Sequence, residues 1–163
     1  MSFRIGSGFD VHATTAGKFV ILGGVKIKAP FSLAGHSDAD VLLHAITDAL
    51  LGAVASEDIG THFPDSTPEN KNRDSSEFLL FAIEEAARKG YELGNLDAVI
   101  ICEAPKIAPH RKEIIKNIST WFHVTQSAIS VKATTTEGLG YTGRGEGIAA
   151  QASVLLKKIN KIS

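Results

Sequence analysis

The strongest constraint on the fold is an apolar repeat that runs through residues 39–55. Its apolar side chains return every three or four residues, which is the spacing of an amphipathic helix packed on a core. The polar loop at residues 35–38 ends in residues that favour a helix N-terminus. We therefore predict a helix over residues 39–55, with Asp40, His44 and Asp48 on one face. The repeat consists of Val41, Leu42, Ala45, Ile46, Ala49, Leu50 and Val54.

The pattern around this helix predicts a sheet covered by helices. Residues 3–12 and 19–27 are rich in strand formers, and the polar turn between them favours an antiparallel pair. Strands and helices alternate in the second half, which indicates a layer of helices on a sheet. The predicted fold class is α/β (α+β), with a mixed β-sheet and helices packed on one face, in a single domain of residues 1–163. The other predicted elements are helices at residues 75–89 and 109–122 and strands at 96–102, 129–134 and 147–156.

The composition excludes several classes of protein. The net charge is −1 and no long run of Lys or Arg occurs, so we expect no nucleic-acid partner. The longest apolar runs, such as residues 49–55, are too short to span a bilayer, so we expect no membrane partner. Cys102 is the one cysteine, and we expect no signal peptide, since residues 1–4 lead directly into the first predicted strand. We expect a cytoplasmic protein in which Cys102 is a small core residue and not a nucleophile.

Asp10 and His12 end the first predicted strand and form a candidate metal site. Side chains two residues apart leave the same face of a strand, and a carboxylate with an imidazole suits zinc. His44, on the predicted helix, is the third candidate, and three protein ligands leave one position open for catalysis. Asp40 or Asp48 is a candidate to hold the metal-binding histidine in its tautomer. The alternative is a pair of surface polar residues at a strand end.

Two loops in the first half are candidates for binding a ligand. His36 and Ser37 lie in the loop before the helix, where backbone N–H groups, a hydroxyl and an imidazole favour an anion. The alternative for Ser37 is a simple helix N-cap. The polar connection at residues 56–72 is longer than a compact domain normally contains, which indicates a binding loop or lid.

Two loops in the second half could hold phosphate. Residues 134–147 begin with three threonine hydroxyls and also contain Glu137, several glycines and Arg144, but no P-loop pattern. Hydroxyls and N–H groups can bind phosphate oxygens, Arg144 can neutralise them, and Glu137 can hold Mg²⁺ between them. Residues 102–108 follow a strand, where Lys106 could meet a phosphate. The alternatives are a glycine-rich hairpin and a proline-stiffened connection.

Taken together, these motifs closely resemble the 2-C-methyl-D-erythritol 2,4-cyclodiphosphate synthase family, from Arg4 to about Lys158. The resemblance implies conversion of 4-diphosphocytidyl-2-C-methyl-D-erythritol 2-phosphate into the cyclic diphosphate, with release of CMP. It implies a homotrimer with active sites between neighbouring subunits, Zn²⁺ or another divalent transition metal, and Mg²⁺ or Mn²⁺ at the diphosphate. The motifs lie, in order, at residues 10–12, 35–40, 58–60, 63–65, 104–106 and 134–147.

The resemblance also implies roles for individual residues. Asp10, His12 and His44 match the zinc ligands, and Glu137 matches the ligand of Mg²⁺ or Mn²⁺. The catalytic positions are His36, beside the attacking phosphate, and Thr135, near the diphosphate that is attacked. Substrate-binding positions are Ser37, Asp58, Ile59, Gly60, Phe63, Pro64, Asp65, Ser66, Thr67, Cys102, Glu103, Ala104, Pro105, Lys106, Ile107, Ala108, Thr134, Thr136, Tyr141 and Arg144.

Two positions depart from the pattern of the family, and two other functions remain open. Thr67 stands where an acidic residue often occurs, and Tyr141 where phenylalanine is frequent, which affects substrate contacts and not the reaction. The alternatives to the cyclase are a non-catalytic sensor of nucleotides or isoprenoid diphosphates and a metal-dependent phosphatase. The first would bind without turnover, and the second would release free phosphate.

Overall fold

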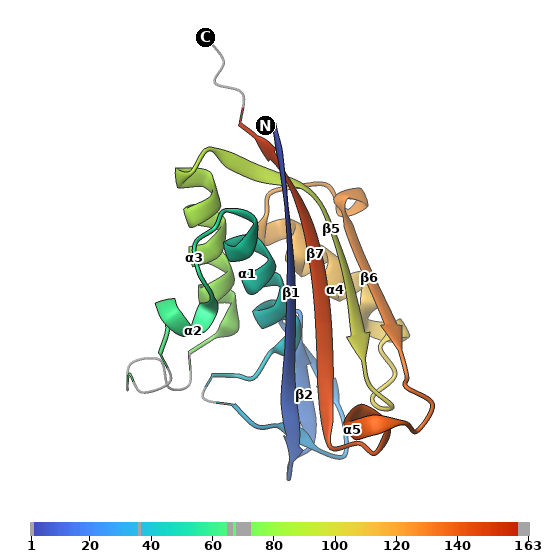
Figure 1. The fold of residues 1–163 in the computed structure, drawn as a ribbon. Coiled ribbons are helices and arrows are strands. Elements are labelled where there is room, and N and C mark those ends of the chain that lie inside the picture. The colour runs from blue at the N-terminus through green and yellow to red at the C-terminus, as the bar shows by residue number, and fades with distance from the viewer. Residues whose placement is uncertain (1, 36, 65–66, 68–72, 160–163) are drawn as a thin grey trace.

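The computed structural model describes residues 2–35, 37–64, 67 and 73–159. Within this part of the chain, the strands form a five-stranded sheet in the order β4-β1-β7-β5-β6 and a separate hairpin of β2 and β3 (Figure 1). The elements are β1 (Phe3–Thr15), β2 (Phe19–Leu22), β3 (Val25–Lys28), β4 (Ser32–Leu33), α1 (Val41–Ala53), α2 (Ile59–His62), α3 (Ser75–Arg88), β5 (Tyr91–Ile101), the 3₁₀ helix η2 (Ala108–His110), α4 (Arg111–Trp121), the 3₁₀ helix η3 (Gln126–Ala128), β6 (Ile129–Thr134), α5 (Gly140–Gly143) and β7 (Gly147–Lys158).

Strand β7 lies at the centre of the sheet between β1 and β5 and runs antiparallel to both. Strand β6 pairs in parallel with the other edge of β5, so the predicted mixed sheet is confirmed. The predicted antiparallel pair of residues 3–12 with 19–27 is wrong. Gly23 and Gly24 have φ angles of 59° and 71°, which reverse the chain inside the second run, so β2 pairs with β3. Strand β1 instead pairs with β7 over most of its length.

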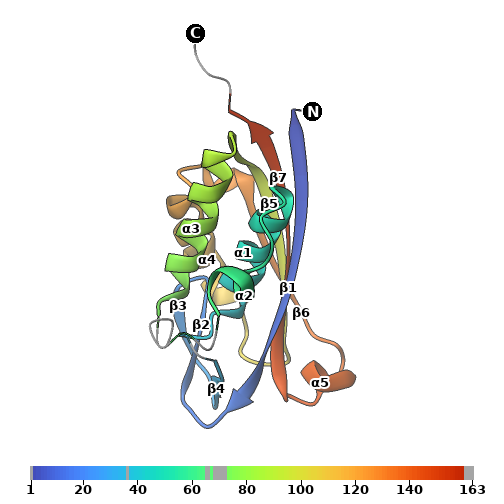
Figure 2. The same cartoon turned by 60° about the vertical axis from the view of Figure 1, so that its left-hand side comes forward.

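Helices α1, α3 and α4 cover one face of the five-stranded sheet, as predicted (Figure 2). Helix α1 packs on β1 and β7 and also contacts α3. Its side chains Leu42, Ile46 and Leu50 are at most 1% exposed. Burial of each such side chain stabilises the fold by roughly 1.5–3 kcal/mol relative to leaving it in water. The core therefore lies between this helix layer and the sheet.

Helix α1 is shorter at both ends than the predicted span of residues 39–55. Ala39 and Ala55 have positive φ angles of 58° and 52°, so neither continues the helix. The N-cap is Asp40, whose buried carboxylate accepts the N–H of Leu43. The same carboxylate accepts both glycine N–H groups in the turn between β2 and β3. Asp40 therefore joins the start of α1 to the hairpin.

Two glycines of β1 allow α1 to lie against the backbone of the strand. A Cβ atom at Gly6 would come within 1.9 Å of the Ala49 carbonyl oxygen, and one at Gly8 within 2.0 Å of the Ala45 carbonyl oxygen. Because non-bonded atoms cannot approach so closely, a side chain at either position would push the helix away. Since His44 immediately precedes Ala45, this close approach also brings His44 over the later residues of β1.

The remaining predicted elements are present: β6 has the predicted bounds, and the others have shifted ends. Strand β5 begins at Tyr91, earlier than predicted, and its register with β7 shifts between Leu93 and Asn95. The predicted long connection at residues 56–72 contains the short helix α2. Over the described ranges, none of the helices has the length and apolar character needed to cross a membrane.

Candidate functional site

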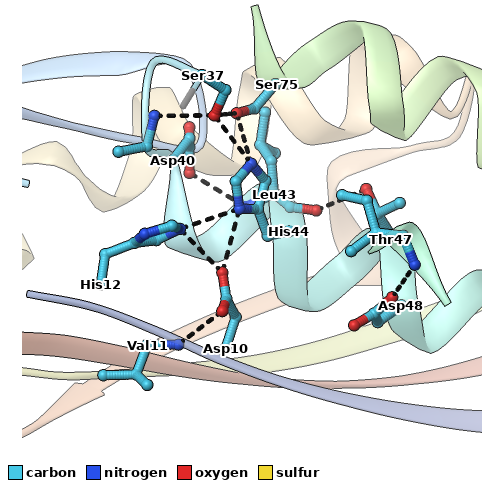
Figure 3. Close-up of polar contacts among 12 residues, drawn as sticks. Asp10, Val11, His12, Ser37, Asp40, Leu43, His44, Thr47, Asp48 and Ser75 are labelled. Carbon is cyan, nitrogen blue, oxygen red and sulfur yellow. Dashed lines mark hydrogen bonds and ion pairs between the residues drawn. The ribbon is translucent and has the colours of Figure 1, made fainter. Parts of the chain in front are cut away.

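Strand β1 and helix α1 bring three candidate metal ligands together. Asp10 and His12 extend from the face of β1 that α1 covers, and His44 projects toward them from the first turn of α1 (Figure 3). His44 Nδ1 lies 3.1 Å from Asp10 Oδ2 and 3.0 Å from His12 Nε2, and these two atoms are 3.0 Å apart. The predicted meeting of these three side chains is therefore confirmed.

The triangle formed by these atoms fits a divalent transition metal. Nitrogen and oxygen ligands about 2.0–2.2 Å from a tetrahedral ion lie about 3.3–3.6 Å from one another. The observed separations are a few tenths of an ångström shorter, which small side-chain rotations correct. Three protein ligands leave one tetrahedral position for water or substrate, as in catalytic zinc sites. The side chains of Asp10, His12 and His44 are 28%, 17% and 12% exposed, so a small molecule can reach the centre.

The electrostatics of the triangle favour an anionic carboxylate. Burial alone would raise the pKa of Asp10, but hydrogen bonds from His12 and His44 outweigh burial and lower that pKa. Burial opposes protonation of His12, yet its contact with Asp10 raises the pKa of the imidazole. A positive charge beside Asp10 is therefore stabilised, whether a proton on His12 or a metal ion supplies it.

Each histidine uses its second ring nitrogen to contact another group. His12 Nδ1 lies 2.9 Å from the Ala34 carbonyl oxygen, and His44 Nε2 lies 2.9 Å from the Ser75 hydroxyl oxygen. Contacts of this kind fix the ring orientation of metal-binding histidines. Ser75 is not among the residues predicted from the sequence, because it is 31 residues from His44 and only the packing of α3 on α1 joins them.

The two aspartates predicted to orient a histidine have other roles. Asp40 accepts backbone N–H groups at the start of α1, and Asp48 Oδ1 accepts the N–H of Ile59 at 2.8 Å. Burial raises the pKa of Asp48. Since His44 contacts Ser75 instead, the prediction that Asp40 or Asp48 holds its tautomer is wrong.

A cavity of about 540 Å³ opens beside the metal ligands, within the size range of small-molecule sites. Helix α2 forms part of its wall, and Asp58 begins this helix by accepting the N–H of Thr61 at 2.8 Å. Hydrogen bonds from Thr61 lower the pKa of Asp58. The rings of Phe63 and Phe78, with centroids 4.7 Å apart, form an apolar side. Of the predicted substrate-binding residues, Ser37, Ile59, Gly60 and Phe63 line the cavity.

A second group of predicted residues lies at the adjacent ends of β5 and β6. Cys102 donates its N–H to the Thr134 carbonyl at 3.0 Å, and Glu103 Oε1 accepts the N–H of Thr136 at 3.0 Å. Burial raises the pKa of the Cys102 thiol to about 11, in agreement with its predicted place in the core. The two loops therefore lie side by side. Within them Lys106, Ala108 and Thr135 are exposed, Ala104 and Pro105 are half-buried, and Ile107 is buried.

The other predicted residues lie further along these loops or beyond α2. Glu137 and Tyr141 are exposed, and Arg144 Nε donates to Glu146 Oε1 at 2.9 Å. For the residues that the structure describes, no hydrogen bond joins this second group to the three metal ligands. Past α2, Thr67 donates its N–H to the Pro64 carbonyl at 3.0 Å. The predicted residues His36, Asp65 and Ser66 lie outside the described residues.

Comparison with known proteins places this architecture in a family. The model of the YgbB family matches residues 3–157. A 2-C-methyl-D-erythritol 2,4-cyclodiphosphate synthase of Bacillus cereus is 56% identical over 156 residues, which cover 96% of this chain and 99% of the relative. A bifunctional enzyme IspD/IspF of Erythrobacter litoralis is 55% identical over 150 residues, which cover 92% of this chain and 39% of that longer protein.

The same relationship holds in three dimensions. The structure of IspF from Plasmodium falciparum in complex with CDP superposes with a TM-score of 0.86 at 41% identity, and 98% of each chain is covered. The residues that the family model matches include β1, α1 and β7 except for Lys158, and with them the three candidate metal ligands. The chain therefore belongs to the YgbB family, the family of the 2-C-methyl-D-erythritol 2,4-cyclodiphosphate synthases that its motifs resemble.

Proposed function

We propose that the protein is a metal-dependent cyclase that converts 4-diphosphocytidyl-2-C-methyl-D-erythritol 2-phosphate into 2-C-methyl-D-erythritol 2,4-cyclodiphosphate and releases CMP. The observation that carries the proposal is the triangle of Asp10, His12 and His44 beside a cavity of about 540 Å³. The Bacillus cereus relative, identical at 56% of positions, carries this activity in its name. We place the reaction in the cytoplasm, where the free thiol of Cys102 stays reduced.

Catalysis of this reaction depends more on positioning the substrate and stabilising charge than on proton transfer. An oxygen of the substrate's own 2-phosphate attacks the diphosphate phosphorus that is attached to the erythritol. The bond from that phosphorus to the CMP oxygen breaks, and CMP leaves with the electron pair. Because the attacking phosphate is already an anion at neutral pH, no strong general base is needed. Holding both ends of the substrate in line can supply an effective molarity of about 10⁵ M or more.

The residues around the cavity suit the first half of this task. Asp10, His12 and His44 would hold Zn²⁺ or another divalent transition metal, which supplies positive charge to phosphate oxygens when it is bound. We assign His36 and the Ser37 hydroxyl to the attacking phosphate. The methylerythritol part then lies against helix α2 and Phe63, which line the cavity. Asp58, with its lowered pKa, remains an anion that can accept hydrogen bonds from a sugar hydroxyl.

The loops after β5 and β6 suit the second half. We assign the cytidine to residues 102–108 and 134–136, which lie side by side. Thr135 is placed near the diphosphate that is attacked, and Glu137 is assigned to a Mg²⁺ or Mn²⁺ ion between the phosphates. Arg144, which now pairs with Glu146, supplies positive charge nearby. The CDP bound to the Plasmodium falciparum protein supports a cytidine-diphosphate ligand.

We further propose a homotrimer in which a site combines loops of neighbouring subunits. Support comes from the separation of the two groups in one chain, since the described residues show no hydrogen bond between them. Support also comes from the open sheet face, where Phe3, Ile5 and Phe9 are 53%, 80% and 55% exposed. A surface of this kind marks a protein interface.

Product analysis tests the proposed reaction directly. Purified protein with Zn²⁺ and Mg²⁺ should convert the cytidine-diphosphate substrate to CMP and a cyclic diphosphate, which phosphorus NMR identifies. Asp10→Ala and His44→Ala should each lower the rate of CMP release by more than about 100-fold, because losing a ligand costs at least as much as losing a group that orients one. His123→Asn is the control, since this histidine is exposed and asparagine tolerates its φ of 54°.

Each other outcome of this experiment contradicts the proposal. Undiminished CMP release in both variants would remove the metal centre from the mechanism. Free phosphate in place of the cyclic product would indicate a phosphatase. Binding of the substrate with no turnover, measured by calorimetry, would indicate a sensor.

A further inference from the structure

We propose that Ser75, supported by Asp38, is a positioning residue of the metal centre that holds the His44 ring with Nδ1 toward Asp10 and His12. The inference rests on the proposed function only in taking these three side chains as metal ligands. Ser75 begins α3 and comes from a part of the chain that supplies no ligand. Its effect would therefore reach the metal only through His44.

Ser75 is placed for this role by its contacts and its burial. The residue is 0% exposed, and its hydroxyl oxygen lies 2.9 Å from His44 Nε2. The same hydroxyl donates to Asp38 Oδ1. On the opposite side of the imidazole, Nδ1 lies 3.1 Å from Asp10 Oδ2 and 3.0 Å from His12 Nε2. One ring thus links the ligand triangle to the buried hydroxyl of Ser75 (Figure 3), and this hydroxyl in turn contacts the Asp38 carboxylate.

The direction of these hydrogen bonds follows from the chemistry of imidazole. A neutral histidine that offers the Nδ1 lone pair to a metal carries its proton on Nε2, and that N–H needs an acceptor. A hydroxyl can both donate and accept a hydrogen bond. Whether it accepts from a given neighbour depends on where its own proton points. Because the Ser75 hydroxyl donates to Asp38, its lone pairs remain available to accept the N–H of His44 Nε2. Asp38 therefore selects the tautomer of His44 that binds a metal.

Other contacts narrow the orientation of His44 but do not replace Ser75. The Ser37 hydroxyl oxygen lies 3.3 Å from His44 Nε2, farther than the 2.9 Å of Ser75, and it also lies 3.3 Å from the Ser75 hydroxyl oxygen. The Phe78 ring packs against His44 with centroids 5.8 Å apart and supplies no acceptor. The shorter contact to Ser75 thus fixes both the plane of the His44 ring and the position of its proton on Nε2.

Metal affinity is the readout that separates this role from a structural one. We expect Ser75→Ala to weaken Zn²⁺ or Co²⁺ binding about 10–100-fold, the usual effect of removing a group that orients a ligand. Affinity is measured by competition with a chelator, and the Co²⁺ absorption spectrum reports the coordination geometry. Ser76→Ala is the matched control, since it removes the same hydroxyl from the next, half-exposed position of α3. It should bind metal as the wild type does.

A second variant separates loss of positioning from loss of folding. Asp38→Asn keeps the size of the acceptor but removes its charge, and it should weaken metal binding in the same direction. In the Ser75→Ala background this substitution should have little further effect, because the two residues act through one chain of hydrogen bonds. Unfolding of each variant without metal is followed in parallel. If Ser75→Ala does not fold, the metal affinity of Asp38→Asn tests the proposal instead.

The outcomes distinguish this inference from the proposed function. Wild-type affinity and spectrum in Ser75→Ala, or in Asp38→Asn where the first variant is unfolded, would overturn the role of Ser75. If the losses of metal affinity are additive in the double variant, Asp38 does not act through the Ser75 hydrogen bond, and its charge affects the metal directly. Failure of the wild-type protein itself to bind a transition metal would instead overturn the metal centre.

Discussion

Glu85 is a buried carboxylate that ties the end of α1 to α3. It is 5% exposed, accepts the Ser56 hydroxyl at 3.0 Å and pairs with Arg88. Lys89 lies 3.6 Å from the same carboxylate and donates to the Val54 carbonyl at the end of α1. This cluster holds the chain just before α2, which forms part of the cavity wall. A residue that does not line the cavity thereby supports one side of it.

Glu85→Gln should reduce stability in a pH-dependent way. Burial alone would raise the pKa of Glu85, but the Ser56 hydroxyl and the charges of Arg88 and Lys89 outweigh it and lower that pKa below 4.5. The charged form therefore stabilises the fold fully above pH 4.5, and this contribution is lost as pH falls through the lowered pKa. At pH 7 the variant should unfold a few degrees earlier, and the difference should shrink below pH 4.5. Thermal unfolding from pH 3 to 8 measures this, and a gap that widens in acid would contradict it.

At the scale of elements, the close contact of α1 with β1 builds the candidate metal centre. Gly6 and Gly8 have no side chains, so the helix backbone rests on the strand. This contact sets the height of His44 above Asp10 and His12. The candidate ligand atoms of Asp10, His12 and His44 are only 3.0–3.1 Å apart. A displacement of the helix large enough to fit an added methyl group would therefore separate them.

Gly8→Ala should therefore damage both stability and metal binding. Its Cβ atom would lie 2.0 Å from the Ala45 carbonyl oxygen, and such overpacking typically costs about 1–3 kcal/mol. Gly52→Ala is the matched control. Gly52 lies inside α1, and a Cβ atom there would be 4.0 Å from its nearest neighbour, the Ser7 carbonyl oxygen of β1. Alanine should stabilise that helical position by up to about 1 kcal/mol. Urea unfolding and cobalt titration measure both effects, and equal stability of the two variants would contradict the packing argument.

Several elements, and the three candidate metal ligands that the structure brings together, were predictable from the sequence because the evidence for them is local. The repeat in residues 39–55 defines α1, and the spacing of Asp10 and His12 places both on one strand face. Strand pairing was less accessible, since the partner of β1 is β7, at the other end of the described chain. The contact between Ser75 and His44 was not accessible either. It depends on how α3 packs on α1, and a serine beside a predicted helix start resembles any capping residue.

At the scale of the molecule, the sheet has one covered and one open face. On β1, the residues that alternate with Gly6 and Gly8 point away from the helices. Phe3, Ile5, Phe9 and Val11 among them are 42–80% exposed. Large apolar side chains in a row on a flat surface are costly in water. In the proposed trimer, a second copy of the chain covers this apolar face.

Ile5→Glu should dissociate the proposed trimer. A charge at this position, 80% exposed in one chain, would become buried and unpaired in an interface. Sedimentation should give three times the 17.3 kDa chain mass for the wild type and one chain mass for the variant. Because Asp10, His12 and His44 belong to one chain, cobalt binding should persist while CMP release falls. Leu80→Glu, on α3, is the control and should keep the wild-type mass. A wild-type monomer with full activity would contradict the trimer.

The central place of β7 has a consequence for the order of events during synthesis. A ribosome produces β1 early, yet this strand gains its long neighbour only after β7 has been translated. Until then β1 pairs only with β4, at Thr14 and Thr15, and the rest of the strand, which carries Asp10 and His12, has no paired neighbour. Nascent chains should therefore be unable to bind a metal ion at Asp10, His12 and His44 until β7 inserts between β1 and β5.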